Sequence, residues 1–133
     1  MTYKIYRHPK GVYKKFSGFV NAQEFLESMF RIYEDPDFDR FAFSINDFTE
    51  ITSFSFDEKD MRNFTAHRLG AALTANIFVA FITTHTHLIS AINDYRLMSR
   101  SATPTEIFPN LEQSLQWIKE QTGLAIAIPE QLD

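Results

Sequence analysis

The sequence contains no cysteine and only four glycines among its 133 residues. The absence of cysteine excludes a disulfide scaffold, a thiol nucleophile and every zinc or iron–sulfur site that needs cysteine ligands. The glycines, at positions 11, 18, 70 and 123, do not form a phosphate-binding loop. The Gly-x-Ser-x-Gly turn of serine hydrolases is also missing. We therefore expect a protein that acts by binding and is not an enzyme.

Long hydrophobic runs are missing as well. The most hydrophobic region, residues 71–82, is interrupted by Thr74 and Asn76 and is well short of the ~20 apolar residues of a membrane span. The first residues lack the apolar stretch and the cleavage site of a secretory signal. We expect a cytoplasmic location.

Hydrophobic residues nevertheless make up 44% of the chain, and charged residues 23%. This hydrophobic content is too high for a disordered protein, and a chain of this length buries roughly 70% of its surface on folding. No repeat or low-complexity linker divides the sequence. Residues 1–133 are therefore expected to form one domain that folds through packing alone.

The net charge of -4 conceals an uneven distribution of charge. Residues 1–20 carry no acid and five basic side chains, those of Lys4, Arg7, Lys10, Lys14 and Lys15. Residues 21–60 carry eleven acids against three basic residues. Because nucleic-acid binding needs a large basic face, we expect no nucleic-acid partner. We expect the basic side chains on the solvated outer faces of two strands, and contact with anionic lipid or an acidic partner is the alternative.

The spacing of apolar residues predicts the order of strands and helices. Strands are predicted at 3–7, 12–20, 41–46, 76–83 and 103–108, and helices at 22–33, 55–73, 86–100 and 110–122. Asn21, Ser55 and Asn110 are expected to cap helices, because each is followed three residues later by Glu or Gln. Residues 47–54 are expected to form a loop. Residues 124–128 are a final strand or an apolar tail that would suit a sheet edge or a homodimer contact.

This order predicts an α/β fold. A hairpin followed by alternating strands and helices requires parallel pairing after the hairpin. We therefore expect a mixed, mostly parallel sheet with an N-terminal hairpin and about four helices. Residues 76–83 are apolar at nearly every position, so helices should cover both faces of the sheet.

Two histidines follow the predicted central strand, where open α/β sheets usually bind ligands. His85 and His87 are two residues apart, and Asp94 lies on the helix that follows. Two histidines at this spacing can share a metal, with Asp94 as a third ligand, but without cysteine or a spaced His-Glu partner the pattern is only a weak indication of a metal site or of an enzyme that uses one. We expect solvated loop histidines, and no metal or cofactor.

Four segments carry a resemblance to a known family. They are Gly18-Phe19-Val20-Asn21, Glu34-Asp35-Pro36-Asp37-Phe38, Ile45-Asn46-Asp47-Phe48 and the stretch from Ile107 to Ile118. In these segments the chain resembles the SpoIIAA-like branch of the STAS fold, relatives of bacterial sporulation anti-sigma-factor antagonists. The resemblance covers residues 3–121.

The resemblance implies a regulatory domain that binds a protein partner. In the anti-sigma-factor antagonists, an Asp ends the third strand and a phosphorylatable serine lies near the start of the second helix. Here Asp47 matches that Asp, and the family's Asp-Ser-Ser-Gly element falls on Ser-Phe-Asp-Glu at 55–58. Phe56 or Asp57 then stands in place of the phosphorylatable serine, unless Ser53 or Ser55 takes over its role. The expected partner site lies between the third strand and the second helix and includes Asp47, Ser53, Ser55 and Asp57.

The same resemblance implies a second role. The SpoIIAA-like branch is related in fold to Sec14-like lipid-binding domains, which suggests an apolar ligand or lipid between the second and third helices, or contact with a bilayer surface. Phe64, Leu88, Ile92 and Tyr95 would line such a site. The 14 phenylalanines would either line it or fill the core. Both roles, partner binding and apolar-ligand binding, stay open on the sequence.

Overall fold

The computed structural model describes residues 2–71, 76–99 and 104–129. In chain order its elements are β1 (Tyr3–His8), β2 (Gly11–Asn21), α1 (Ala22–Tyr33), the short 3-10 helix η1 (Phe38–Arg40), β3 (Phe43–Ser55), α2 (Glu58–Ala71), β4 (Phe78–Ile82), α3 (Thr86–Ser99), β5 (Thr105–Phe108) and α4 (Leu111–Thr122). The predicted order of strands and helices is confirmed. The expected element ends at Leu73, Arg100 and Thr103 lie outside the described residues.

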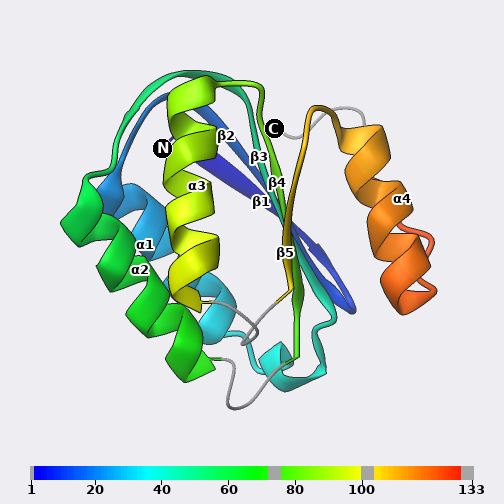
Figure 1. Ribbon diagram of the computed structural model, residues 1–133. Coiled ribbons are helices and arrows are strands. Elements are labelled where there is room, and N and C mark those ends of the chain that lie inside the picture. The colour runs from blue at the N-terminus through cyan, green and yellow to red at the C-terminus, as the bar shows by residue number, and fades with distance from the viewer. Residues whose placement is uncertain (1, 72–75, 100–103, 130–133) are drawn as a thin grey trace.

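Within the described residues, five strands form one sheet in the order β1-β2-β3-β4-β5 (Figure 1). β1 and β2 pair antiparallel as a hairpin. β2 with β3, β3 with β4 and β4 with β5 are parallel pairs. The predicted α/β class, with a mixed and mostly parallel sheet, is therefore correct.

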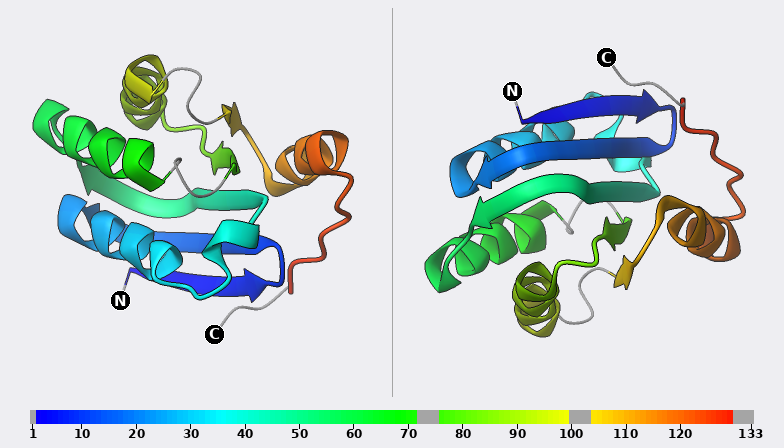
Figure 2. Two further views of the ribbon diagram at one scale, coloured as in Figure 1. Left: turned by 90° about the horizontal axis from the view of Figure 1, so that it is seen from below. Right: turned by 90° about the horizontal axis from the view of Figure 1, so that it is seen from above.

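Helices cover both faces of the sheet, in unequal numbers (Figures 1 and 2). α1, α2 and α3 pack on one face over a large aromatic core, which includes Phe16, Phe25 and Phe64. Of the described helices, α4 alone packs on the other face, over a smaller core that includes Ile45 and Ile118. The sheet thus separates two cores.

The predicted loop at residues 47–54 is wrong, because β3 continues through it to Ser55. These residues lack a clear apolar pattern, but β2 runs alongside them as far as Asn21 and pairs with Ser55. The parallel ladder satisfies their backbone N–H and C=O groups, which decides the conformation. Beyond Asp47, where pairing with β4 ends, β3 pairs with β2 alone.

Two of the three predicted helix caps are correct. The side chains of Asn21 and Asn110 accept hydrogen bonds from the backbone N–H of Glu24 and Gln113, both at 2.8 Å. Ser55 is not a cap, since it is the last residue of β3. α2 is capped by Asp57, which accepts from the Asp60 N–H at 2.8 Å while the Asp60 carboxylate accepts from the Asp57 N–H at 3.0 Å.

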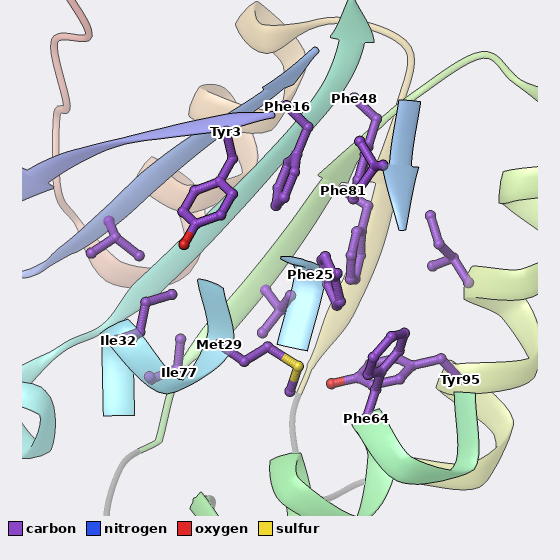
Figure 3. Packing of buried hydrophobic residues seen from close by; sticks show 14 of the residues in the cluster. Tyr3, Phe16, Phe25, Met29, Ile32, Phe48, Phe64, Ile77, Phe81 and Tyr95 are labelled. Carbon is purple, nitrogen blue, oxygen red and sulfur yellow. The ribbon is translucent and has the colours of Figure 1, made fainter. Parts of the chain in front are cut away.

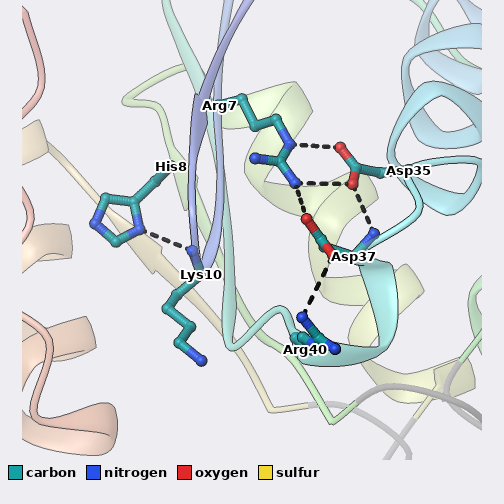
Figure 4. Close-up of polar contacts among 6 residues, drawn as sticks. All are labelled: Arg7, His8, Lys10, Asp35, Asp37 and Arg40. Atoms are coloured by element: carbon teal, nitrogen blue, oxygen red, sulfur yellow. Dashed lines mark hydrogen bonds and ion pairs between the residues drawn. The ribbon is translucent and has the colours of Figure 1, made fainter.

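Most of the N-terminal basic side chains lie at the surface, as predicted. Arg7 donates to Asp35 at 2.6 Å and to Asp37 at 2.7 Å, and so ties β1 to the connection between α1 and η1 (Figure 4). The Arg7 guanidinium lowers the pKa of Asp35. Beside it, His8 Nδ1 accepts from the Lys10 N–H and closes the hairpin turn.

Residues 124–128 form no strand. The side chains of Leu124, Ile126 and Ile128 pack against the smaller core, as Tyr6 of β1 does. This segment therefore covers the α4 face of its own sheet (Figure 2). Among the described helices, none has both the length and the hydropathy needed to cross a bilayer.

At the start of β2, adding one methyl group to Gly11 should reduce the stability of the protein strongly. Gly11 pairs with Phe43, and a Cβ at Gly11 would lie 2.3 Å from the Phe43 carbonyl oxygen. Gly11→Ala should therefore force the strands apart and lower the free energy of unfolding by about 1–3 kcal/mol. Urea unfolding followed by the fluorescence of Trp117 measures this loss.

Gly70→Ala is the matched control. A Cβ at this helical position meets no atom within 4 Å, so the variant should gain about 0.5–1 kcal/mol from its better helix propensity. Equal stability of the two variants would contradict the close approach of β2 to β3.

Candidate functional site

The core beneath α1, α2 and α3 is built mainly from aromatic rings (Figure 3). Phe16 stacks on Phe48 with ring centroids 4.6 Å apart, and Phe25 meets Phe64 edge-on at 4.9 Å. Offset-stacked and edge-on rings are the favourable geometries for such pairs. Most of the predicted phenylalanine cluster is therefore packed core.

This aromatic core encloses a cavity of about 40 Å³ between the sheet and the three helices. The four residues predicted to line an apolar site, Phe64, Leu88, Ile92 and Tyr95, all line this cavity. They come from α2 and α3 and are at most 5% exposed. The structure thus places all four around one space.

The floor of the cavity, on the sheet, is partly polar. Lys14 of β2, together with Ser44 and Asn46 of β3, lines it, and Lys14 is the register partner of Asn46. Lys14 Nζ donates to Ser28 Oγ of α1 at 3.1 Å. Asn46 Nδ2 donates to the Ala80 carbonyl at 3.4 Å, and Asn46 Oδ1 has no hydrogen-bond partner in the described part of the chain.

The roof of the cavity holds a second cation, Arg68 of α2. Arg68 is 5% exposed, and among the described residues its Nε and Nη2 have no hydrogen-bond partner. The structure buries the whole Arg68 side chain and leaves Leu69 40% exposed. No carboxylate from the described part of the chain lines the cavity.

The prediction that Lys14 lies on a solvated face is wrong. Lys14 is 2% exposed because it lies between Val12 and Phe16 on the side of β2 that the helices cover. Neighbouring side chains on a strand point to opposite faces, so Lys14 and Lys15 cannot both face solvent on a covered sheet. This adjacency, with apolar residues two positions away on either side, is the sequence signal that identifies the buried lysine.

Burial and charge change the pKa values of groups in the cavity lining. Burial, assisted by the nearby Arg68 charge, lowers the pKa of Lys14 to about 7. Burial raises the pKa of Tyr33 and of Tyr95, and the Arg68 guanidinium opposes both shifts. Both tyrosines are therefore neutral donors near neutral pH.

A larger groove of about 560 Å³ adjoins the cavity, between the start of α2 and α3. Its apolar walls are Phe54, Phe56, Met61, Ala91 and Leu97. Its polar residues are Asp57, Glu58, His87, Ser90 and Asp94. Phe56 and Met61 line both the groove and the cavity, so they form the wall between the two spaces.

The residues predicted to bind a partner do not form one site. Asp47 is buried and accepts hydrogen bonds from the Tyr13 hydroxyl, in the smaller core, and from Thr49. Ser53 and Ser55 are exposed on the two-stranded end of β3, and Asp57 caps α2. Asp47 therefore serves the fold, and the other three lie at the surface.

The histidines after β4 do not gather metal ligands. The rings of His85 and His87 are 6.0 Å apart, and the His85 ring packs against Phe54. Within residues 2–71, 76–99 and 104–129, no group of three or more His, Cys, Asp or Glu side chains is placed to hold a metal ion.

Comparison with protein-family models, curated proteins and solved structures found no match to this chain. The resemblance to the SpoIIAA-like branch therefore stays a prediction. The function is inferred below from the cavity and the groove.

The buried Lys14 predicts a specific pH dependence of stability. An unfolded chain keeps its lysine protonated up to about pH 10, whereas folded Lys14 loses its proton near pH 7. Between these values the unfolded state binds more protons, so the Lys14 contribution to stability rises with pH, by up to about 1.4 kcal/mol per pH unit. Lys14→Met removes this contribution. The variant should be more stable than the wild type at pH 7, and the difference should shrink toward pH 10.

Urea unfolding at a series of pH values measures this difference in stability. The buried tyrosines are present in both the wild type and the variant, so their raised pKa values contribute equally and cancel. Lys15→Met is the control, because Lys15 is partly exposed and pairs with Glu50 at 3.3 Å. A difference for Lys14→Met that stays constant from pH 7 to pH 10 would show that this lysine is solvated in the folded protein.

Proposed function

We propose that this domain binds a small molecule with an apolar body between its sheet and helices α2 and α3. The observation that carries the proposal is that the groove adjoins the cavity, with Phe56 and Met61 lining both. The groove volume of about 560 Å³ falls within the range of small-molecule sites. The cavity, at about 40 Å³, admits only one small end of such a molecule.

The lining also suits a ligand site. Its walls are largely aromatic and aliphatic, and a few polar groups line the same space, as in typical small-molecule sites. Those groups are cations, hydroxyls and one amide, which hold and orient a ligand. The proposed role is therefore binding without chemistry.

Entry of the ligand requires only local motion. Phe56 precedes α2, and Met61 lies in its first turn. Methionine has three rotatable bonds and repacks readily. Rotation of these two side chains would join the groove to the cavity while the sheet stays fixed.

A second candidate function is regulation through a protein partner, and one observation favours it. Phe19 is 51% exposed and pairs in register with Ser53 on the two-stranded end of β2 and β3. A large exposed aromatic side chain beside Ser53 and Ser55 is a plausible contact for a partner. Mass spectrometry of protein isolated from its native cells should then detect phosphate on one of these serines, and its absence under all growth conditions would remove the phosphorylation switch.

Filling the groove should abolish small-molecule binding. Ala91 of α3 lines the groove and is partly buried. Ala91→Trp would place an indole where the ligand body lies. We expect native mass spectrometry to show a bound small molecule on wild-type protein purified without detergent or organic solvent, and none on Ala91→Trp.

Ala66→Trp is the control, because Ala66 is exposed on α2 and lies outside both linings. It should keep the ligand. A ligand retained by Ala91→Trp would place the binding site elsewhere. Wild-type protein that carries no small molecule, and takes up none from a lipid extract, would contradict the proposed function.

A further inference from the structure

We propose that the bound molecule is a monocarboxylic acid whose carboxylate enters the cavity and pairs with Arg68, with Lys14 beside it. This inference rests on the proposed function and names the chemical class of its ligand.

Arg68 provides the strongest evidence. The residue is only 5% exposed, so its side chain is buried. Its guanidinium cannot lose its charge. The two atoms without a partner, Nε and Nη2, lie on the same edge of the guanidinium. That edge donates two parallel hydrogen bonds to a carboxylate. The unpaired atoms are therefore those that a carboxylate would use.

The rest of the cavity favours an anion. Lys14 is a second buried basic group, and within the described part of the chain no carboxylate lines the cavity to neutralise either of them. A buried charge without a counter-charge is costly, so an anionic ligand supplies what the protein lacks. The remaining unpartnered atom of the lining, Asn46 Oδ1, is an acceptor and does not contribute to holding an anion.

The size of the cavity favours a small anionic group. A volume of about 40 Å³ has room for a carboxylate. A phosphate or sulfate group is larger. At the groove, Asp57, Glu58 and Asp94 would repel a second negative charge. These features together indicate a single carboxylate on an apolar body.

The test compares two probes with the same chain, decanoate and 1-decanol, by isothermal titration calorimetry. The wild type should bind decanoate about ten- to a hundredfold more tightly than 1-decanol, because charge-assisted hydrogen bonds are formed only with the acid. Arg68→Met should remove this preference and keep the binding of 1-decanol.

Arg62→Met is the matched control, since Arg62 is an exposed arginine of α2 that pairs with Glu58. It should keep the preference for decanoate. Arg68→Met also removes a buried unpaired charge, so the variant should still fold. Without ligand, its urea unfolding midpoint should be higher than that of the wild type. Loss of acid binding in a more stable variant separates ligand recognition from a merely structural role.

Proton uptake provides a second readout, for Lys14. The titratable or charged groups that line the cavity around Lys14 are Arg68 of α2, Tyr33 of α1 and Tyr95 of α3. A carboxylate arriving among them favours protonated Lys14, so decanoate binding at pH 8 should take up a proton from the buffer. Titrations in two buffers of different ionisation enthalpy measure this uptake, and Lys14→Met should abolish it. Equal heats in both buffers would show that the carboxylate does not reach Lys14.

The outcomes distinguish the inference from the proposed function. Equal affinity for decanoate and 1-decanol, or a preference that survives Arg68→Met, overturns the carboxylate inference and leaves the proposed function intact. A neutral or cationic molecule identified on the purified protein does the same. Failure of both probes, together with no bound molecule on the wild type, overturns both.

Discussion

The parallel ladder between β2 and β3 is the constraint on which the rest of the structure depends. It places Lys14 directly beside Asn46 and so sets two polar side chains on the floor of an otherwise aromatic core. The same ladder continues past the end of β4 to Ser55 of β3. Asp57, which caps the start of α2, follows two residues later. The cavity floor, the two-stranded extension and the position of α2 therefore follow from one pairing.

The buried cations reveal a conflict between stability and function. A core of this size would be more stable with apolar residues in place of Lys14 and Arg68. Lys14 reduces its cost by giving up its proton near neutral pH, whereas Arg68 cannot. Such conflicts between local rules and global stability tend to mark functional sites. Two such groups line the cavity, which supports its proposed role as the ligand site.

The sequence predicted the architecture better than the site. Local signals determine the helix ends at Asn21, Asn110 and Gly123, and the structure has all three, with Gly123 in the left-handed conformation at φ 78°. The continuation of β3 beyond Asp47 depended on a partner strand distant in sequence, so no local pattern revealed it. Arg68 and Lys14 were missed as a pair because charged residues are usually placed at the surface, and only the tertiary packing of α2 over β2 brings them together.

The division of the core by the sheet also affects motion. The smaller core, with Ile118 fully buried under α4 and the 124–128 segment over its edge, shares no buried residue with the aromatic core. Separate cores allow α2 and α3 to open locally at a lower free energy than global unfolding. During such an opening, the α4 side keeps the strands in place.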